Sequence, residues 1–499
     1  MENRNAAYRR AAGRARGVGM LRACLGAALV LSALARPAVA ADVAAAEPLD
    51  ARRVPASAVA ADVATAEPLD ARRVPASAVA ADVAAAEPLG AHRVPTGAVA
   101  ATTATTATTE PIDAHRAPAG AVVAVPAPGF GDERRFMHGI ATVSAGHGSH
   151  WVFFSSSGLP PRGANPDGSW PHDVYVGRWA PGQAALAGVH RFIGRPEAQE
   201  PVSVAQNTDG RLFVTFEDGW NAPRNVSQRF GVYRDDLTPI VSYPSEVESG
   251  GHSGHVAAVG RRFVVFYSEG WVQGGGIDNL GSGDGVAAKV YDGAGTLLRR
   301  VEVMPHGREW WPMIAGSPSR ALLVWQKFIP GDTIARLRYA LLDPATGKFV
   351  RVPGSLDDLR VQYYTYAAEW VPAVGRFVLE ATLADGRTTV MLIDEAGQVT
   401  ARLACLPASV REAGVVVDGA NAYVPTRDGR LMTLALTGDS IALHGLMPAP
   451  FAWGNTGVTG IANGPASLHM VSLSPSGLRE ADFDTRQAVP PAESDRCGP

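Results

Sequence analysis

The sequence predicts an all-β fold, a seven-bladed β-propeller that follows a signal peptide and a disordered repeat linker. Seven runs of β-forming residues recur between Ala145 and Gly477, each after small residues and a turn rich in Gly, Asp, Asn or Pro. The runs lie roughly 45 to 60 residues apart, which is the period of propeller blades. A β-helix has a shorter period, and no long amphipathic helical pattern is present. The runs are HWVFFSS (150–156), RLFVTFE (211–217), RRFVVFYS (261–268), RALLVWQ (320–326), RFVLEAT (376–382), NAYVPT (421–426) and SLHMVSL (467–473).

A hairpin pattern follows several of the runs. VYDGAGTLL (290–298), LLDPATGKFV (341–350) and LIDEAGQVTA (392–401) each place an Asp and a Gly-containing turn between two apolar stretches. Such turns connect antiparallel strands. We therefore expect these segments to form the two outer strands of their blades.

Residues 1–40 have the pattern of a signal peptide. Four arginines lie between residues 9 and 16, an apolar stretch covers 20–35, and Ala38-Val39-Ala40 is a small-residue cleavage site. A retained membrane anchor is the alternative. Cleavage after Ala40 predicts a secreted or periplasmic protein with no stable membrane span in the mature chain.

The next segment repeats a proline-containing unit. ADVAAAEPLDARRVPASAVA (41–60) recurs almost unchanged at 61–80 and with drift at 81–100. The units contain no aromatic residue and too few large apolar side chains to offset the entropy of ordering. The sequence thus predicts a disordered linker over 41–125, a propeller over 126–490 and a short tail over 491–499.

Cysteine and charge content restrict the remaining properties. Cys405 and Cys497 remain after cleavage, and in an exported chain they form either a disulfide or two free thiols. The net charge of −3 gives a nucleic-acid role no electrostatic support. We expect a monomer whose partner is an acidic polysaccharide or another glycan.

Polar and aromatic residues concentrate in the segments that precede the runs, including MHGIATV (137–143) and REWWPMIAG (308–316). We expect the runs to be the innermost strands of their blades, so that in a shared register the segments leading into them meet at one mouth of the channel. The catalytic candidates there are His138, Tyr364, Arg308 and Arg411. The substrate-binding candidates are Glu200, Trp310, Trp311, Tyr363 and Tyr366, together with His172 from the insertion 155–179.

These residue types suit an acidic sugar. Aromatic faces stack on sugar rings, arginine binds carboxylate or sulfate, and histidine and tyrosine transfer protons. Each candidate residue also has a structural interpretation. In that interpretation the tryptophans fill gaps between blades and the tyrosines alternate along a strand. Arg411 then forms an internal ion pair with Glu412, and His138 is a hydrogen-bonded core histidine.

His252 and His255 in GGHSGH (250–255) are the candidate metal ligands, for Zn or Ca. Residues three apart on a strand lie on opposite faces, so a metal site requires a bend between them. The Gly-rich run 274–285 lacks the context and the lysine of a phosphate-binding loop and is better interpreted as a long connection.

Residues 136–412 resemble seven-bladed propeller polysaccharide lyases, the ulvan lyases in particular. The pieces that carry the resemblance are MHGIATV, EPVSVAQNTDGRLFVTFEDGW, GHSGHVAAVGRRFVVFYSEGW and REWWPMIAGSP. The resemblance implies β-elimination across a uronic-acid linkage. It implies His138 as base, Tyr233 or Tyr364 as acid, and Arg308 or Arg411 as the group that neutralises the substrate carboxylate.

Three functional hypotheses follow. The first is an exported lyase acting on an acidic polysaccharide, the second a non-catalytic propeller that binds glycan or protein at the cell envelope, and the third a structural scaffold. A hydrolase would need two carboxylates, for which Glu200 and Glu412 are available. Burial and pairing of His138 and Arg411 would favour binding or structure, whereas an open groove with unpaired polar atoms would favour catalysis.

Overall fold

The computed structural model describes residues 133–163, 165, 171–219, 226–270, 285–329, 334–464 and 466–492. These ranges belong to the second of two compact units, Pro111–Pro499. The predicted signal peptide, the repeat linker and Cys497 lie outside them. Cys405 takes part in a disulfide bond. No helix in the described ranges has the length and apolar character needed to cross a bilayer.

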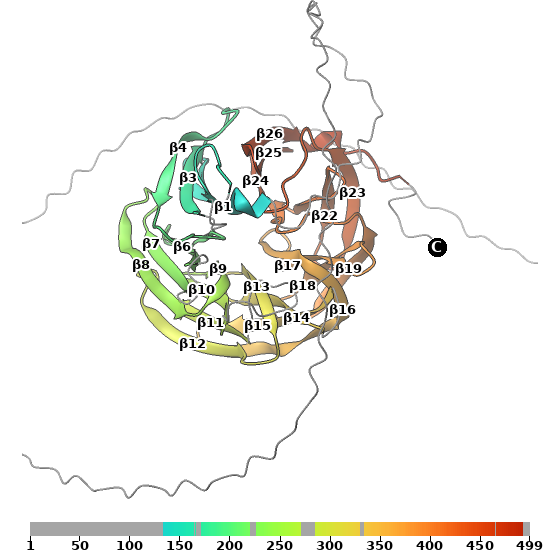
Figure 1. Cartoon of the computed structure of the whole chain (residues 1–499). Helices are drawn as coiled ribbons and strands as arrows, with labels where there is room; N and C mark the ends of the chain where they lie inside the picture. The colour runs from blue at the N-terminus through green and yellow to red at the C-terminus, as the bar shows by residue number, and fades with distance from the viewer. Residues whose placement is uncertain are drawn as a thin grey trace, which may run out of the picture. The chain divides into compact units, whose positions relative to one another are not determined.

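The described strands form seven blades around a ring, which confirms the predicted all-β propeller. Blades one, two, three and six are separate four-stranded sheets. Blades four and five share one long strand, β16, whose first part pairs with β15 and whose last part pairs with β17. The described part of blade seven has three strands. In Figure 1 the blades follow one another around the ring from cyan to red, and the first lies beside the last.

The strand bounds are as follows. Blade one contains β1 (Met137–Gly146), β2 (Ser149–Ser156), β3 (Asp173–Trp179) and β4 (Ala187–Ile193). Blade two contains β5 (Ser203–Gln206), β6 (Leu212–Asp218), β7 (Ser227–Tyr233) and β8 (Pro239–Ser249). Blade three contains β9 (His252–Val259), β10 (Arg262–Glu269), β11 (Gly285–Tyr291) and β12 (Leu297–Met304). Blades four and five contain β13 (Glu309–Gly316), β14 (Ala321–Phe328), β15 (Ile334–Asp343), β16 (Lys348–Val371), β17 (Arg376–Leu383), β18 (Thr388–Ile393) and β19 (Val399–Leu406).

Blade six contains β20 (Val416–Asp418), β21 (Asn421–Pro425), β22 (Arg430–Leu436) and β23 (Ile441–Pro448). Blade seven contains β24 (Val458–Ala462), β25 (Ser467–Ser474) and β26 (Gly477–Asp484). The helices of the described ranges are two short 3-10 helices, η1 (Glu133–Arg135) and η2 (Thr485–Gln487).

The first strand of each blade lies innermost, and these first strands contact one another around the ring. They are the small-residue segments, whereas the β-forming runs are the second strands, such as HWVFFSS in β2. Placing the runs innermost is therefore wrong by one strand. Neighbouring inner strands approach one another closely, since a Cβ atom on Gly316 would clash with the Ala258 carbonyl of the next blade. Ala, Gly and Ser are weak β-formers, so the innermost strands give a weak strand signal.

Apolar side chains fill the space between neighbouring blades. One cluster joins Val264 and Phe266 of β10 to Leu323 and Trp325 of β14. The second strands are thus covered on both faces, and every residue of β6 is buried. Burial on both faces explains why their sequences are nearly continuous apolar runs.

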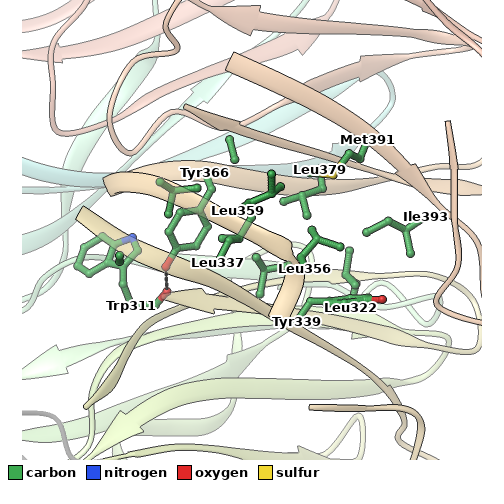
Figure 2. Packing of buried hydrophobic residues seen from close by; sticks show 14 of the residues in the cluster. Trp311, Leu322, Leu337, Tyr339, Leu356, Leu359, Tyr366, Leu379, Met391 and Ile393 are labelled. Carbon is green, nitrogen blue, oxygen red and sulfur yellow. Dashed lines mark hydrogen bonds between the residues drawn. The ribbon is translucent and has the colours of Figure 1, made fainter. Parts of the chain in front are cut away.

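Figure 2 shows the corresponding cluster between blades four and five. There Leu322 and Leu337 of blade four pack with Leu379 and Met391 of blade five. Buried apolar side chains of this size contribute about 1.5 to 3 kcal/mol each relative to exposure. The blades are therefore held chiefly by their neighbours, as in other repeat folds.

The predicted outer hairpins are confirmed at β11–β12, β15–β16 and β18–β19. In the last of these, Asp394 Oδ1 accepts the backbone N–H groups of Ala396 and Gln398 at 2.9 and 2.8 Å. Gly397 follows with φ of 79°. Asp caps such turns through its side chain, and Gly adopts left-handed backbone without a steric penalty.

The ring closes by packing between blades one and seven, which belong to different sheets. The Gly139 N–H donates to the Thr456 carbonyl at 2.9 Å. The indole of Trp179 in β3 stacks on the His469 ring of β25, with centroids 4.8 Å apart and an interplanar angle of 24°. We call this junction the seam.

Candidate functional site

In blades three to six, a left-handed residue lies at the start of the inner strand. Ser253, Trp311, Tyr364 and Glu412 have φ of 52°, 55°, 63° and 55°. The strand register shifts beside the first three. Such bulges re-aim neighbouring side chains, and each left-handed non-glycine residue costs about 1 to 3 kcal/mol. The fold therefore accepts strain at the same point of four blades, where these segments meet.

Five side chains from blades one, two and six join at this end of the ring, and we call them the mouth network: His138, His172, Glu200, Arg411 and Glu412. Nε2 of His138 lies 2.8 Å from Glu412 Oε2, and its Nδ1 lies 3.5 Å from Glu200 Oε2. The same Glu200 oxygen contacts Nδ1 of His172. Arg411 Nη2 lies 2.7 Å from Glu412 Oε1. One imidazole thus connects carboxylates from two other blades.

The mouth network is closed to solvent. His138 is 1% exposed and Arg411 is 5% exposed. The cavity beside His138 measures about 10 Å³, which is room for about one water molecule. Arg134 of η1 lines it together with Glu200 and Trp310. The helix η1 therefore contributes a wall of this cavity.

Opposite charges keep the two carboxylates of the mouth network ionised. Burial raises the pKa of Glu200, but the charges and hydrogen bonds of His172 and His138 outweigh it and lower that pKa below its usual range. Burial likewise raises the pKa of Glu412, and Arg411 and His138 hold it at about 2. Burial lowers the pKa of His138, but Glu412 and Glu200 together outweigh this effect and the pKa is raised.

Glu217 at the end of β6 behaves in the opposite way. It lines the same cavity as Glu200, is buried, and accepts the backbone N–H of Ser253. Burial raises the pKa of Glu217 to about 7; the negative charge of Glu200 adds to the rise, and the bond from Ser253 opposes it. One cavity therefore holds an ionised carboxylate and a carboxyl that is partly protonated at neutral pH.

Aromatic rings surround the mouth network. The indole of Trp311 stacks on the His138 ring, with centroids 6.5 Å apart and an interplanar angle of 19°. The Tyr364 ring meets the Trp311 indole edge to face at 4.5 Å, and the Arg411 guanidinium lies 4.3 Å above the Tyr364 ring. This shell excludes water and strengthens each charge interaction inside it.

The remaining predicted site residues pack around this centre or away from it. The Tyr366 hydroxyl donates to the Trp311 carbonyl, and Tyr363 packs 5.0 Å from Phe328. The Arg308 guanidinium lies over Trp310 and Phe328, at 4.8 and 4.6 Å from the ring centroids. These residues support the mouth from within blades four and five.

Tyr233 of β7 lies elsewhere. Its ring packs 4.9 Å from Phe192 in the apolar cluster between blades one and two, and burial raises its pKa to about 12. Among the described residues, its packing partners belong to that cluster and not to the mouth network. As an acid for this site, Tyr364 is therefore better placed.

His252 and His255 flank the bend that a metal site would require, because Ser253 is left-handed. His252 Nδ1 lies 3.1 Å from Ser253 Oγ, and His255 Nδ1 lies 2.7 Å from the Pro312 carbonyl. Burial and the charge of Arg308 lower the pKa of His252 to about 3. Across the described ranges, no group of three His, Cys, Asp or Glu residues is placed to hold a metal ion.

Sequence reasoning missed Arg134, Glu217 and Ser253. A usable signal existed for Glu217, because second strands run antiparallel to inner strands and end where those begin. A polar residue that ends an apolar run, as in FVTFE, is therefore directed to the mouth. Gln326 ends the corresponding run of β14, and its Oε1 accepts the Tyr364 N–H at 3.2 Å.

An ionised carboxylate and a protonated carboxyl in one cavity are the groups that acid–base chemistry uses. Contact with a reacting ligand needs more room than this cavity has, since it holds about one water molecule. These groups can hold protons and charges at fixed positions. A ligand could reach them only after a wall of the cavity, such as η1, has moved aside.

No family model matches the sequence, and no curated protein matches it. Among solved structures, Kuenenia stuttgartiensis hydrazine synthase aligns with a TM-score of 0.43 and 13% identity, over 73% of this chain and 99% of the other. Penicillium chrysogenum α-L-arabinanase aligns with a TM-score of 0.39 and 13% identity, over 71% and 95%. The Streptococcus pneumoniae NanB sialidase aligns with a TM-score of 0.41 and 10% identity, over 72% and 70%. Similarity this distant transfers no function to the chain.

Proposed function

We propose that this protein is an exported, non-catalytic β-propeller that binds an acidic glycan. The observation that carries the proposal is the state of His138 and Arg411, which are both buried and both engaged by Glu412. A base must reach the proton it removes, and an arginine that neutralises a substrate carboxylate must have its donors free. Neither requirement is met while the mouth network stays closed.

The test compares binding and cleavage on the same samples. The full chain is titrated calorimetrically with polygalacturonate, dextran sulfate and neutral dextran, and each mixture is followed for ultraviolet absorbance from an unsaturated uronate. We expect saturable binding to an anionic polymer without a rise in absorbance. Absence of binding to every polymer would contradict the proposal.

Cleavage of such a glycan at the mouth is the second candidate, in its simplest form the uronate lyase that the sequence resemblance implies. Two observations favour it: the opposite pKa shifts of Glu200 and Glu217, and the four left-handed residues, whose cost a purely structural cluster could avoid. Elimination would require the wall formed by η1 to open and Arg411 to exchange Glu412 for the substrate carboxylate.

The second candidate has its own signature. A lyase would raise the absorbance and lose that activity in His138→Ala. A hydrolase would release reducing ends without absorbance and lose activity in Glu217→Gln, the variant that removes the protonated carboxyl. Retention of activity in both variants would place the chemistry outside the mouth.

A further inference from the structure

A groove of about 750 Å³ lies at the other end of the blades from the mouth network. Its walls come from the turns β5–β6, β9–β10, β11–β12, β13–β14 and β15–β16, in blades two, three and four. Strand β9 begins at His252, whose Nδ1 lies 3.9 Å from Oε1 of Glu217 in the cavity beside His138, and it ends at Val259, which lines the groove. An eight-residue strand spans about 26 Å, so the two places are physically separate. The volume lies within the range of ligand pockets.

Four arginines line this groove, and two of them are already neutralised. Arg261 Nε lies 2.8 Å from Asp209, and Arg320 Nη1 lies 3.4 Å from Asp343. Asp292, which also lines the groove, uses its Oδ1 to accept the backbone N–H groups of Ala294 and Thr296 at 2.9 and 2.8 Å. The aspartates are thus committed to neighbouring arginines or to their own turns.

The other two arginines, Arg211 and Arg262, have no carboxylate partner among the residues that the structure describes. Both residues are half-buried, and neither side chain is held in place by an ion pair with a carboxylate of the groove. Apolar side chains lie beside them, namely Ile240, Val259 and Leu298, of which Leu298 is 43% exposed. Forked cationic donors next to aliphatic surface match a ligand that alternates anionic groups with C–H faces.

We infer that this arginine groove binds the anionic groups of an acidic glycan, with Arg211 and Arg262 as its carboxylate- or sulfate-binding residues. The inference rests on the proposed function and assigns it a place on the molecule. A concave site of this size accommodates a few sugar units, whereas a folded protein partner needs a flatter face of roughly 800 Å².

The test uses the full chain and a matched pair of double variants. Arg211→Gln with Arg262→Gln removes the two unpartnered charges. Arg191→Gln with Arg486→Gln removes the same net charge from exposed arginines that pair with Asp173 and Asp484 outside the groove. Thermal unfolding of both variants is compared with that of the wild type to confirm that the fold is kept. Binding to polygalacturonate and to dextran sulfate separates carboxylate from sulfate recognition.

We expect the groove variant to bind about tenfold more weakly for each arginine lost and to show a weaker dependence on salt, since each arginine is one charge-assisted contact. The control variant should bind as the wild type does. Unchanged binding in the groove variant would overturn this inference and leave the proposed function standing. No glycan binding by the wild type would overturn both. Stronger binding to polyglutamate than to either glycan would replace the glycan with an acidic peptide.

Discussion

At the scale of single residues, two glutamates in one cavity should respond oppositely to the same substitution. Burial raises the pKa of Glu217 to about 7, above its ordinary value of 4.5, so the folded state binds more protons than the unfolded state between these values. The free energy of unfolding therefore falls as pH rises through this window. Glu217→Gln should remove this pH-dependent loss of stability and so stabilise the protein by up to about 3 kcal/mol above pH 7. Urea unfolding of both proteins near pH 5 and near pH 8 measures the difference in unfolding free energy.

Glu200→Gln should destabilise the protein at neutral pH, because it leaves His138 and His172 buried without their shared carboxylate. Breaking a buried ion pair from one side costs about 3 to 5 kcal/mol. The pKa of Glu200 is lowered in the fold. Its contribution is thus present above the unfolded pKa and lost as pH falls, so the difference from wild type should shrink in acid. Shifts of the same sign in both amides would contradict the assigned charges.

The meeting of these residues was predictable from the sequence only in part. His138, Glu200 and Arg411 converge as expected, because the segments that carry them share one register around the axis. Their burial was not predictable, since one wall of the cavity beside them comes from Arg134, which precedes the first strand and belongs to no repeat. Tyr233 misled because the pattern of an outer strand does not show on which side of the blade a tyrosine lies.

At the scale of elements, the Asp-capped hairpins should depend on the acceptor oxygen rather than on the charge. Asp394→Ala removes the acceptor for two backbone N–H groups and should lower the free energy of unfolding by about 1 kcal/mol. Asp394→Asn keeps a carbonyl oxygen at the same place and should restore most of the loss. Equal losses in the two variants, measured by thermal unfolding, would show that the charge matters instead.

The same elements show what sequence patterns reveal. The outer hairpins were predictable because Asp and Gly have individual conformational reasons to occupy those turns. The inner strands were misplaced by one position because channel crowding selects small residues, and that tertiary requirement overrides strand propensity. The four left-handed positions had no sequence signature, since Ser, Trp, Tyr and Glu are not the residues that left-handed backbone favours.

At the scale of the whole molecule, the ring should be least stable where it closes. The seam joins the first and the last blade, whereas every other pair of neighbouring blades is consecutive along the chain. Trp179→Ala removes a fully buried indole that stacks on His469 and should cost about 3 to 5 kcal/mol. Hydrogen exchange should then accelerate in blades one and seven before it does so in blades three to five. Uniform acceleration around the ring would indicate that the blades open as one unit.

The ring itself was predictable from repetition alone. A period of this length, with short strands and turn residues, has few other solutions, and each blade needs a neighbour to cover its faces. The repeat period does not predict how the last blade packs against the first. That contact joins residues such as Trp179 and His469, which occupy no repeated position.

The seam also determines how the protein would respond to mechanical load. A pull from the residues before Glu133 reaches β1 through η1, and β1 lies at the seam. Blades four and five cannot separate without breaking the shared strand β16, whereas no strand is shared across the seam. Under load the ring would therefore open at the seam. The arginine groove, built from blades two to four, lies away from that weak point. Force on the chain would thus open the ring at the seam first and leave the walls of the groove in place.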